Sequence, residues 1–109
     1  MNSIILPGRL QGVDPRQLRA LLTVVETQSF REAATRLGYA QSAVSHQIKA
    51  LEQALGTRLL ERGVGRREVR PTEAGTVACA HARRLIAAYS DLAADFEARA
   101  RGDAGLVRI

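Results

Sequence analysis

The chain has 109 residues, 46% of them hydrophobic, and carries a formal net charge of +5. This length and composition suit one domain with a modest core and argue against disorder throughout. Cys79 is the single cysteine, which excludes an internal disulfide and a metal site of paired cysteines, and no apolar run is long enough to span a membrane.

The N-terminal segment and the basic residues set the first expectations. Residues 1–13 lack the basic start of a signal peptide, so we expect a flexible tail on a cytoplasmic protein with no membrane partner. The basic residues are nearly all Arg, with Lys49 as the one lysine. Arg suits phosphates and base edges, so nucleic acid is a candidate partner, although the positions of these residues matter more than their number.

Two short helices are predicted next, each with its own start signal. Asp14 suits the N-cap, Pro15 suits the first helical position and Gln17 completes a capping box, so a helix is predicted from Pro15 to about residue 27. Its apolar residues recur at helical spacing: Leu18, Leu22 and Val25. Ser29 and Glu32 predict a second capping box, and Gly38 ends the helix that they start.

A third helix is predicted over residues 41–55, after a turn so tight that the pair forms a helix-turn-helix. Its apolar stripe is Val44, Ile48, Leu51 and Leu55. The other face of its first turns carries hydrogen-bonding side chains: Gln41, Ser42, Ser45, His46 and Lys49. A merely solvated face favours Glu, Lys and Arg, so we interpret this face as one that reads base edges in a major groove. The alternatives are plain solvent exposure and, for Gln41, capping of the start of the helix.

A small hairpin, or wing, is predicted after the third helix. Two short extended runs, 59–62 and 68–70, flank a turn that contains glycine. At the tip, Arg66 and Arg67 suit a minor groove or a phosphate. On the strands, Arg62 and Arg70 suit phosphates or, alternatively, ion pairs with neighbouring glutamates.

The last helix is predicted to open at Pro71-Thr72 and to run to about Arg101. It carries an apolar seam with alternating spacings of four and three residues: Ala78, Ala82, Leu85, Tyr89, Leu92 and Phe96. Such a helix is too long for the preceding domain to cover, so the seam predicts a homodimer. His81, beside the seam, is expected to be structural.

These residues resemble the DNA-binding domain of LysR-type transcriptional regulators. The resemblance is carried by SFREAATRLGYAQSAVSHQIKALEQALGTRLLER, by the Arg-rich wing and by RPTEAG. It implies a mainly α fold, with a winged helix-turn-helix domain over 14–71 and a dimerisation helix over 72–101. It also implies that residues 102–109 begin a missing effector-binding domain. Ala40 departs from the family pattern, because Ser or Thr usually caps the third helix there.

The resemblance further implies the function and the contact residues. A family member binds an inverted-repeat operator in double-stranded DNA as a dimer, with a tetramer as a possible full-length form, and meets its small-molecule effector through the missing domain. The predicted DNA contacts are Ser29, through its backbone N–H, and Gln41, Ser42, Ser45, His46, Lys49, Arg62, Arg66, Arg67, Arg70 and Thr72.

Two other classes of function remain to be compared. A protein-interaction module would carry apolar or acidic residues on the outer face of the third helix, where this chain has Gln, Ser, His and Lys. An enzyme finds no support, because the two histidines lie on separate helices and no Gly-rich phosphate loop occurs. We therefore expect neither catalysis nor a cofactor.

Overall fold

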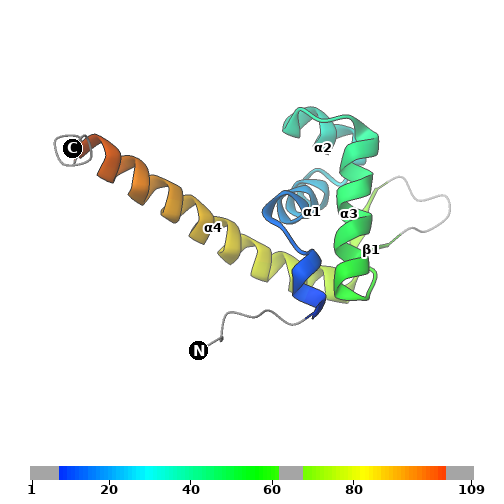
Figure 1. Cartoon of the computed structure of the whole chain (residues 1–109). Coiled ribbons are helices and arrows are strands. Elements are labelled where there is room, and N and C mark those ends of the chain that lie inside the picture. Colours follow the sequence, from blue (N-terminus) through cyan, green and yellow to red (C-terminus); the bar gives the residue numbers. More distant parts are fainter. Residues whose placement is uncertain (1–7, 62–67, 103–109) are drawn as a thin grey trace.

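The computed structural model describes residues 8–61 and 68–102, and Figure 1 shows a cluster of short helices from which one long helix projects. In chain order the elements are η1 (Gly8–Gly12), α1 (Pro15–Thr27), α2 (Phe30–Leu37), α3 (Gln41–Leu55), β1 (Leu60–Glu61), β2 (Arg70–Pro71) and α4 (Glu73–Gly102). The two strands pair antiparallel, with Leu60 opposite Pro71. The predicted mainly α fold with a two-stranded wing is confirmed. None of the described helices is both long and apolar enough to cross a lipid bilayer.

The start of α1 forms as its capping signal predicts. The Asp14 carboxylate accepts hydrogen bonds from the backbone N–H groups of Arg16 (2.8 Å) and Gln17 (3.2 Å). The Gln17 side chain accepts in return from the Asp14 N–H at 3.1 Å, which completes the capping box. The side-chain amide of Gln17 also donates to the Gly12 carbonyl at 2.9 Å, so this cap joins η1 to α1.

The flexible tail expected over residues 1–13 is wrong for residues 8–12, which form the 3₁₀ helix η1. This segment packs against the C-terminal end of α3, where a Cβ added to Gly12 would lie 3.2 Å from the Cβ of Ala54. The Val13 N–H donates to the Leu10 carbonyl at 3.2 Å. Val13, which follows η1, packs against the core, whereas Leu10 remains 42% exposed. Residues 1–7 lie outside the described part of the chain.

The second capping box forms only in part. Ser29 Oγ accepts from the Glu32 N–H at 3.0 Å, as predicted. The Ser29 N–H does not use the Glu32 side chain and donates to Thr27 Oγ1 at 3.3 Å. The reason is the preceding turn, in which Gln28 adopts a left-handed conformation (φ 59°) and brings the Thr27 hydroxyl next to Ser29. Gly38, with φ 76°, ends α2 as expected.

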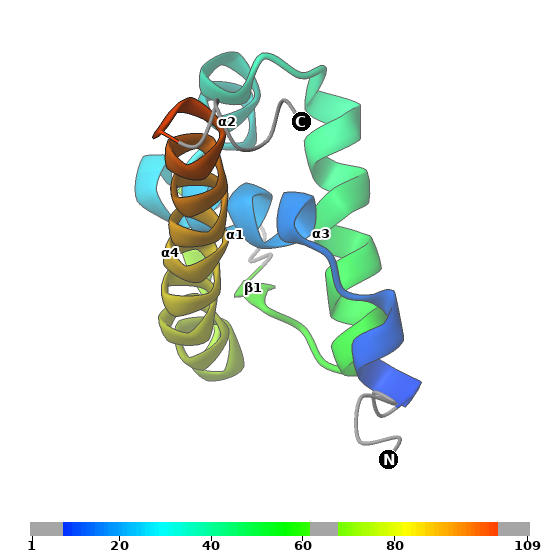
Figure 2. The ribbon, with the colours of Figure 1, turned by 60° about the vertical axis from the view of Figure 1, so that its left-hand side comes forward.

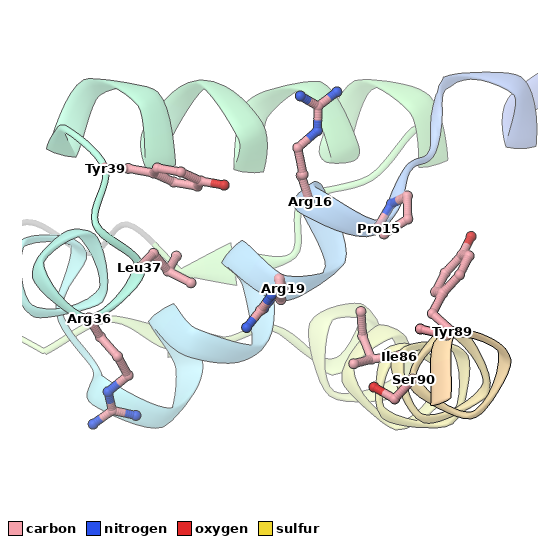
Figure 3. Close-up of a pocket in the computed structure, with 10 residues that line it drawn as sticks. Pro15, Arg16, Arg19, Arg36, Leu37, Tyr39, Ile86, Tyr89 and Ser90 are labelled. Carbon is pink, nitrogen blue, oxygen red and sulfur yellow. The ribbon is translucent and has the colours of Figure 1, made fainter. Parts of the chain in front are cut away.

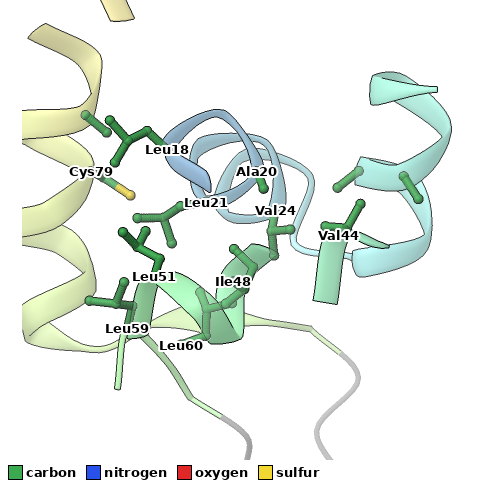
Figure 4. Packing of buried hydrophobic residues seen from close by; sticks show 13 residues of the cluster. Leu18, Ala20, Leu21, Val24, Val44, Ile48, Leu51, Leu59, Leu60 and Cys79 are labelled. Atoms are coloured by element: carbon green, nitrogen blue, oxygen red, sulfur yellow. The ribbon is translucent and has the colours of Figure 1, made fainter. Parts of the chain in front are cut away.

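The core lies around α1, which contacts α2, α3 and α4 (Figure 4). Its largest fully buried side chains are Leu21, Val24, Val44, Ile48, Leu51, Leu59 and Leu60. Cys79 enters this core from α4, and burial raises the pKa of its thiol while nearby Arg83 opposes this with a smaller effect. The thiol is therefore protonated and enclosed, and it acts as a small hydrophobic side chain.

The start of α4 differs from the prediction by two residues. Pro71 pairs in β2, and α4 begins at Glu73 and continues through Gly102. Thr72 is the capping residue, because its Oγ1 accepts from the Gly75 N–H at 2.9 Å. The Thr72 N–H donates to the Leu59 carbonyl at 2.9 Å, and this bond to the strand region holds the chain extended for two more residues.

The inner face of α4 is a stripe of residues packed on the domain: Gly75, Cys79, Ala82 and Ile86. The C-terminal end of the helix extends away from the other elements (Figure 1), and Figure 2 shows the helix foreshortened beside α1. Ala82 is fully buried by its own chain, so it is not exposed to a partner as the predicted seam required. Ala82 belongs to both the inner stripe and the predicted seam, and the domain core covers it.

Gly75 marks the closest approach of α4 to the wing. A Cβ at this position would overlap the Leu59 carbonyl group. Because backbone atoms cannot move aside as a flexible side chain does, we expect Gly75→Ala to lower the free energy of unfolding by about 1–3 kcal/mol. Urea unfolding followed by circular dichroism measures this. Gly102→Ala is the matched control, because nothing lies within 4 Å of its added Cβ, and an equal loss in both variants would contradict the close contact.

Candidate nucleic-acid interface

The polar face of α3 lies opposite the stripe that anchors the helix. Val44, Ile48 and Leu51 are fully buried in the core. The side chains predicted to read bases are exposed, apart from half-buried Ser45: Gln41, Ser42, Ser45, His46 and Lys49. None of these five forms a hydrogen bond or ion pair with another described residue. The structure therefore brings together a set of donors and acceptors whose hydrogen-bonding capacity is open to an external partner.

The N-terminus of α3 is open as well. Ala40 occupies the N-cap position and provides no side-chain hydrogen bond, as its departure from the family pattern predicts. The first N–H groups of a helix carry a partial positive charge and have no intrahelical acceptor. An anionic group that approaches Gln41 and Ser42 would meet these N–H groups, which suits a phosphate.

Helix α2 supports α3 and does not itself present a free donor at Ser29. Ala33 and Ala34 are buried, so α2 packs closely against its neighbours. The Ser29 N–H, predicted to bind phosphate, donates to Thr27 Oγ1, and the Ser29 hydroxyl caps α2. In this structure Ser29 therefore has a structural role.

The base of the wing is held by a carboxylate that sequence reasoning missed. Glu52, on α3, accepts hydrogen bonds through Oε2 from the N–H groups of Leu59 (2.8 Å) and Leu60 (3.3 Å). Directly before β2, the Val69 N–H donates to the Gln28 carbonyl, in the turn after α1, at 3.1 Å. The available sequence signal is an acidic residue directly after buried Leu51, and its spacing from β1 is visible only in the fold. These bonds fix the wing relative to α3.

The remaining predicted contacts have different outcomes. Arg70 pairs with Glu68 at 3.4 Å, which confirms the ion pair that was the alternative to a phosphate contact. Thr72 Oγ1 donates to the Arg58 carbonyl at 2.8 Å in addition to capping α4, so its hydroxyl is structural. The other predicted arginines of the wing lie outside the described residues: Arg62, Arg66 and Arg67.

A separate cavity of about 460 Å³ lies between α1, α2 and α4 (Figure 3). Arg16, Arg19 and Tyr39 line it together with Tyr89 on α4. Among the described residues that line it there is no carboxylate, histidine or cysteine, so it offers no acid–base pair for catalysis. No group of three or more potential metal ligands occurs within residues 8–61 and 68–102.

Comparisons with known proteins agree with this geometry. The family model for bacterial regulatory helix-turn-helix proteins of the lysR family matches residues 15–76. The chain is 40% identical over 98 residues to the HTH-type transcriptional regulator YnfL of Escherichia coli K12, covering 90% of this chain and 32% of YnfL. It is 37% identical over 101 residues to XapR of the same organism, covering 93% of this chain and 34% of XapR. The chain thus spans about a third of the length of these curated relatives.

Two solved structures of protein–DNA complexes resemble the fold. One is the BenM DNA-binding domain with catB site 1 DNA, with a TM-score of 0.74 and 38% identity, covering 81% of this chain and 96% of that one. The other is full-length CbnR with its target DNA, with a TM-score of 0.73 and 35% identity, covering 84% of this chain and 31% of that one.

The Glu52 contact predicts a stabilising link between α3 and the wing. Glu52→Ala leaves the N–H groups of Leu59 and Leu60 without this acceptor, so we expect a loss of about 1–3 kcal/mol in the free energy of unfolding. Amide hydrogen exchange at these two residues is expected to accelerate at least tenfold. Gln53→Ala, at the exposed neighbouring position, is the control. Unchanged exchange in Glu52→Ala would show that other contacts hold the wing base.

Proposed function

Because the chain belongs to the lysR family of bacterial regulatory helix-turn-helix proteins, we propose that it is the DNA-binding and dimerisation part of a sequence-specific transcriptional regulator. The observation that carries the proposal is the polar face of α3, which is exposed and makes no hydrogen bond with the described residues. A major groove admits an α-helix and offers donors and acceptors on every base pair. The neutral side chains of this face match that chemistry.

The N-terminal residues of α3 are proposed to read sequence. A Gln side chain pairs bidentately with adenine through its amide oxygen and nitrogen, which is the role we assign to Gln41. Ser42 and Ser45 donate to or accept from several bases, and His46 donates to a purine acceptor. Lys49, one turn further along the helix, reaches a phosphate or a guanine.

The phosphate backbone is proposed to supply much of the affinity. The net charge of +5 and the arginines of the wing favour a polyanion. Arg62, Arg66 and Arg67 remain proposed contacts to phosphate or minor groove. Arg70 exchanges its ion pair with Glu68 for a phosphate, which costs little because both side chains are more than half exposed.

Dimerisation through α4 is proposed to place two copies on an inverted-repeat operator. Beyond the domain, α4 carries an apolar row that is 45–60% exposed: Leu85, Tyr89, Leu92 and Phe96. A row of large apolar side chains at this spacing favours a partner helix. In this assignment residues 14–71 bind DNA and 72–101 join the copies. The chain spans about a third of the length of YnfL and XapR, which supports the proposal of a further domain that responds to a small-molecule effector and permits tetramers.

Replacement of Gln41 tests the reading face. We expect Gln41→Ala to cost about 1–3 kcal/mol on the preferred duplex and to relax the preference at one position of each half-site. Titrations against the preferred duplex and a set of single-base changes measure both effects. Gln53→Ala removes the same side chain from the far end of the same helix and is expected to change neither. If Gln41→Ala still discriminates between the preferred duplex and the single-base changes, other residues read the bases.

Replacement of Leu85 tests the dimer. Leu85→Asp places a charge in the apolar row, where burial against a partner helix is unfavourable, so we expect the variant to sediment as a monomer at concentrations where the parent is a dimer. Ala87→Asp puts the same charge on the opposite, exposed side of α4 and is expected to leave the dimer intact. Equal masses for the parent and Leu85→Asp would remove α4 from the interface.

A further inference from the structure

An apolar groove of about 360 Å³ lies beside the first turns of α4. We call it the N-terminal groove. One wall is formed by Leu10 and Val13, before α1, and by Leu55 at the end of α3. The floor on α4 contains Ala78, beside His81. In Figure 2 η1 and the end of α3 lie across from α4, with α1 between them.

The exposure of this groove shows that residues 8–61 and 68–102 do not cover it. Leu10 is 42% exposed and Val77, at the edge on α4, is 56% exposed. The groove is continuous with the apolar row of α4, because Leu85 belongs to both. A partner helix that covers the row therefore reaches the groove.

The spacing of the row identifies which part of a second copy arrives there. Outside buried Ala82, the positions 78 and 96, and likewise 85 and 89, are symmetric about residue 87. A two-fold antiparallel pair of α4 helices therefore places Leu85 opposite the partner's Tyr89, and Ala78 opposite the partner's Phe96. The small side chain of Ala78 leaves space in the groove, and Phe96, 60% exposed in its own chain, has the bulk to fill it.

Charges beside the row favour the same orientation. Arg84 donates to His81 Nδ1 at 3.1 Å, which places a guanidinium at the groove. Antiparallel pairing brings the partner's Asp95 to the level of this guanidinium, because Asp95 lies on the same side of the row as His81. In a parallel pair the partner's Asp95 would instead lie about 16 Å along the helix from Arg84, too far for an ion pair.

We propose that the partner's Phe96 occupies the N-terminal groove, so that η1 is part of the dimer interface. This inference rests on the proposed dimerisation through α4. It adds that the partner's Phe96 fills the N-terminal groove and that η1 forms one wall of that contact. The part played by η1 is specific to this chain, because η1 lies outside residues 15–76, which the family model matches. In the dimer, Leu10 lies against the partner's Phe96 and loses its exposure to water.

Disulfide trapping of the whole chain tests the contact. Leu10→Cys combined with Phe96→Cys is expected to give covalent dimers under mild oxidation. Within one chain the pair cannot close, because Ala78 and Phe96 are about 27 Å apart along α4 and a disulfide needs Cα atoms within about 7 Å. The parent is the control, since its single cysteine, Cys79, is buried and is expected to give no covalent dimer.

Two further variants separate the possible failures. Ala78→Cys with Phe96→Cys tests the antiparallel register alone. Covalent dimers from this pair, but not from Leu10→Cys with Phe96→Cys, would overturn the role of η1 and leave the α4 dimer standing. Dimers from Phe96→Cys alone would indicate parallel helices and overturn the inference. If no variant gives a covalent dimer and sedimentation gives a monomer mass, the proposed α4 dimer is overturned as well. Titration with a DNA duplex tests the proposed DNA binding independently of these results.

A charge in the wall provides the second measurement. Leu10→Asp is expected to raise the dimer dissociation constant at least tenfold in sedimentation without DNA. Ala43→Asp is the control, because Ala43 is exposed on α3 and lines neither the groove nor the cavity beside Tyr89. Equal dissociation constants for the parent and Leu10→Asp would remove η1 from the interface.

Discussion

The packing of the α4 backbone on the backbone before β1 is the contact on which the rest of the structure depends. At Gly75 no side chain separates the helix from the Leu59 carbonyl, and Thr72 bonds to the carbonyls of Arg58 and Leu59. These contacts place the start of α4 beside the wing and close the core, into which Cys79 and Ala82 insert. The direction of α4, and hence the position of a second copy, follows from this one junction.

Helix α3 divides its residues between anchoring and recognition. Its buried stripe is narrow, with Val44, Ile48 and Leu51 fully enclosed. The polar side chains before and between them have no role in the core. Glu52 is the exception among the polar residues, because it turns toward the wing and holds two backbone N–H groups. A helix anchored along one stripe and tied to the wing at its far end keeps its N-terminal end exposed in a defined orientation.

Helix α4 serves its own domain first and a partner second. The inner stripe at Gly75, Cys79 and Ala82 is covered by the chain, whereas the row from Leu85 to Phe96 is exposed. The two sets overlap at Ala82, so a partner helix must share the first half of α4 with the domain. In the proposed dimer this places the end of one α4 next to η1 and the end of α3 of the other copy. Through these contacts the spacing of the two reading helices is coupled to the α4 pair.

Local signals in the sequence determined the helices, because caps and turns act over a few residues. Asp14 with Gln17, and the glycines at 38 and 56, set the helix ends, and the apolar spacing set the buried stripe of α3. In α1 the predicted stripe was wrong beyond Leu18, because Leu21 and Val24 are buried whereas Leu22 and Val25 are half-buried. The wing and the polar face of α3 were also predictable, since both follow from residue type and spacing. Contacts between distant segments were decided only by the tertiary structure.

Of the expectations that the structure corrects, two depend on contacts between distant parts of the chain, and the one at Ser29 depends on the adjacent turn. Residues 8–12 form η1 because the end of α3 offers an apolar surface. Ala82 is buried because α1 covers it, and Ser29 turns its N–H to Thr27 because Gln28 adopts a left-handed turn. Periodicity shows that a residue lies on an apolar face, but which surface covers that face depends on how the helices pack, and that packing is a property of the whole fold.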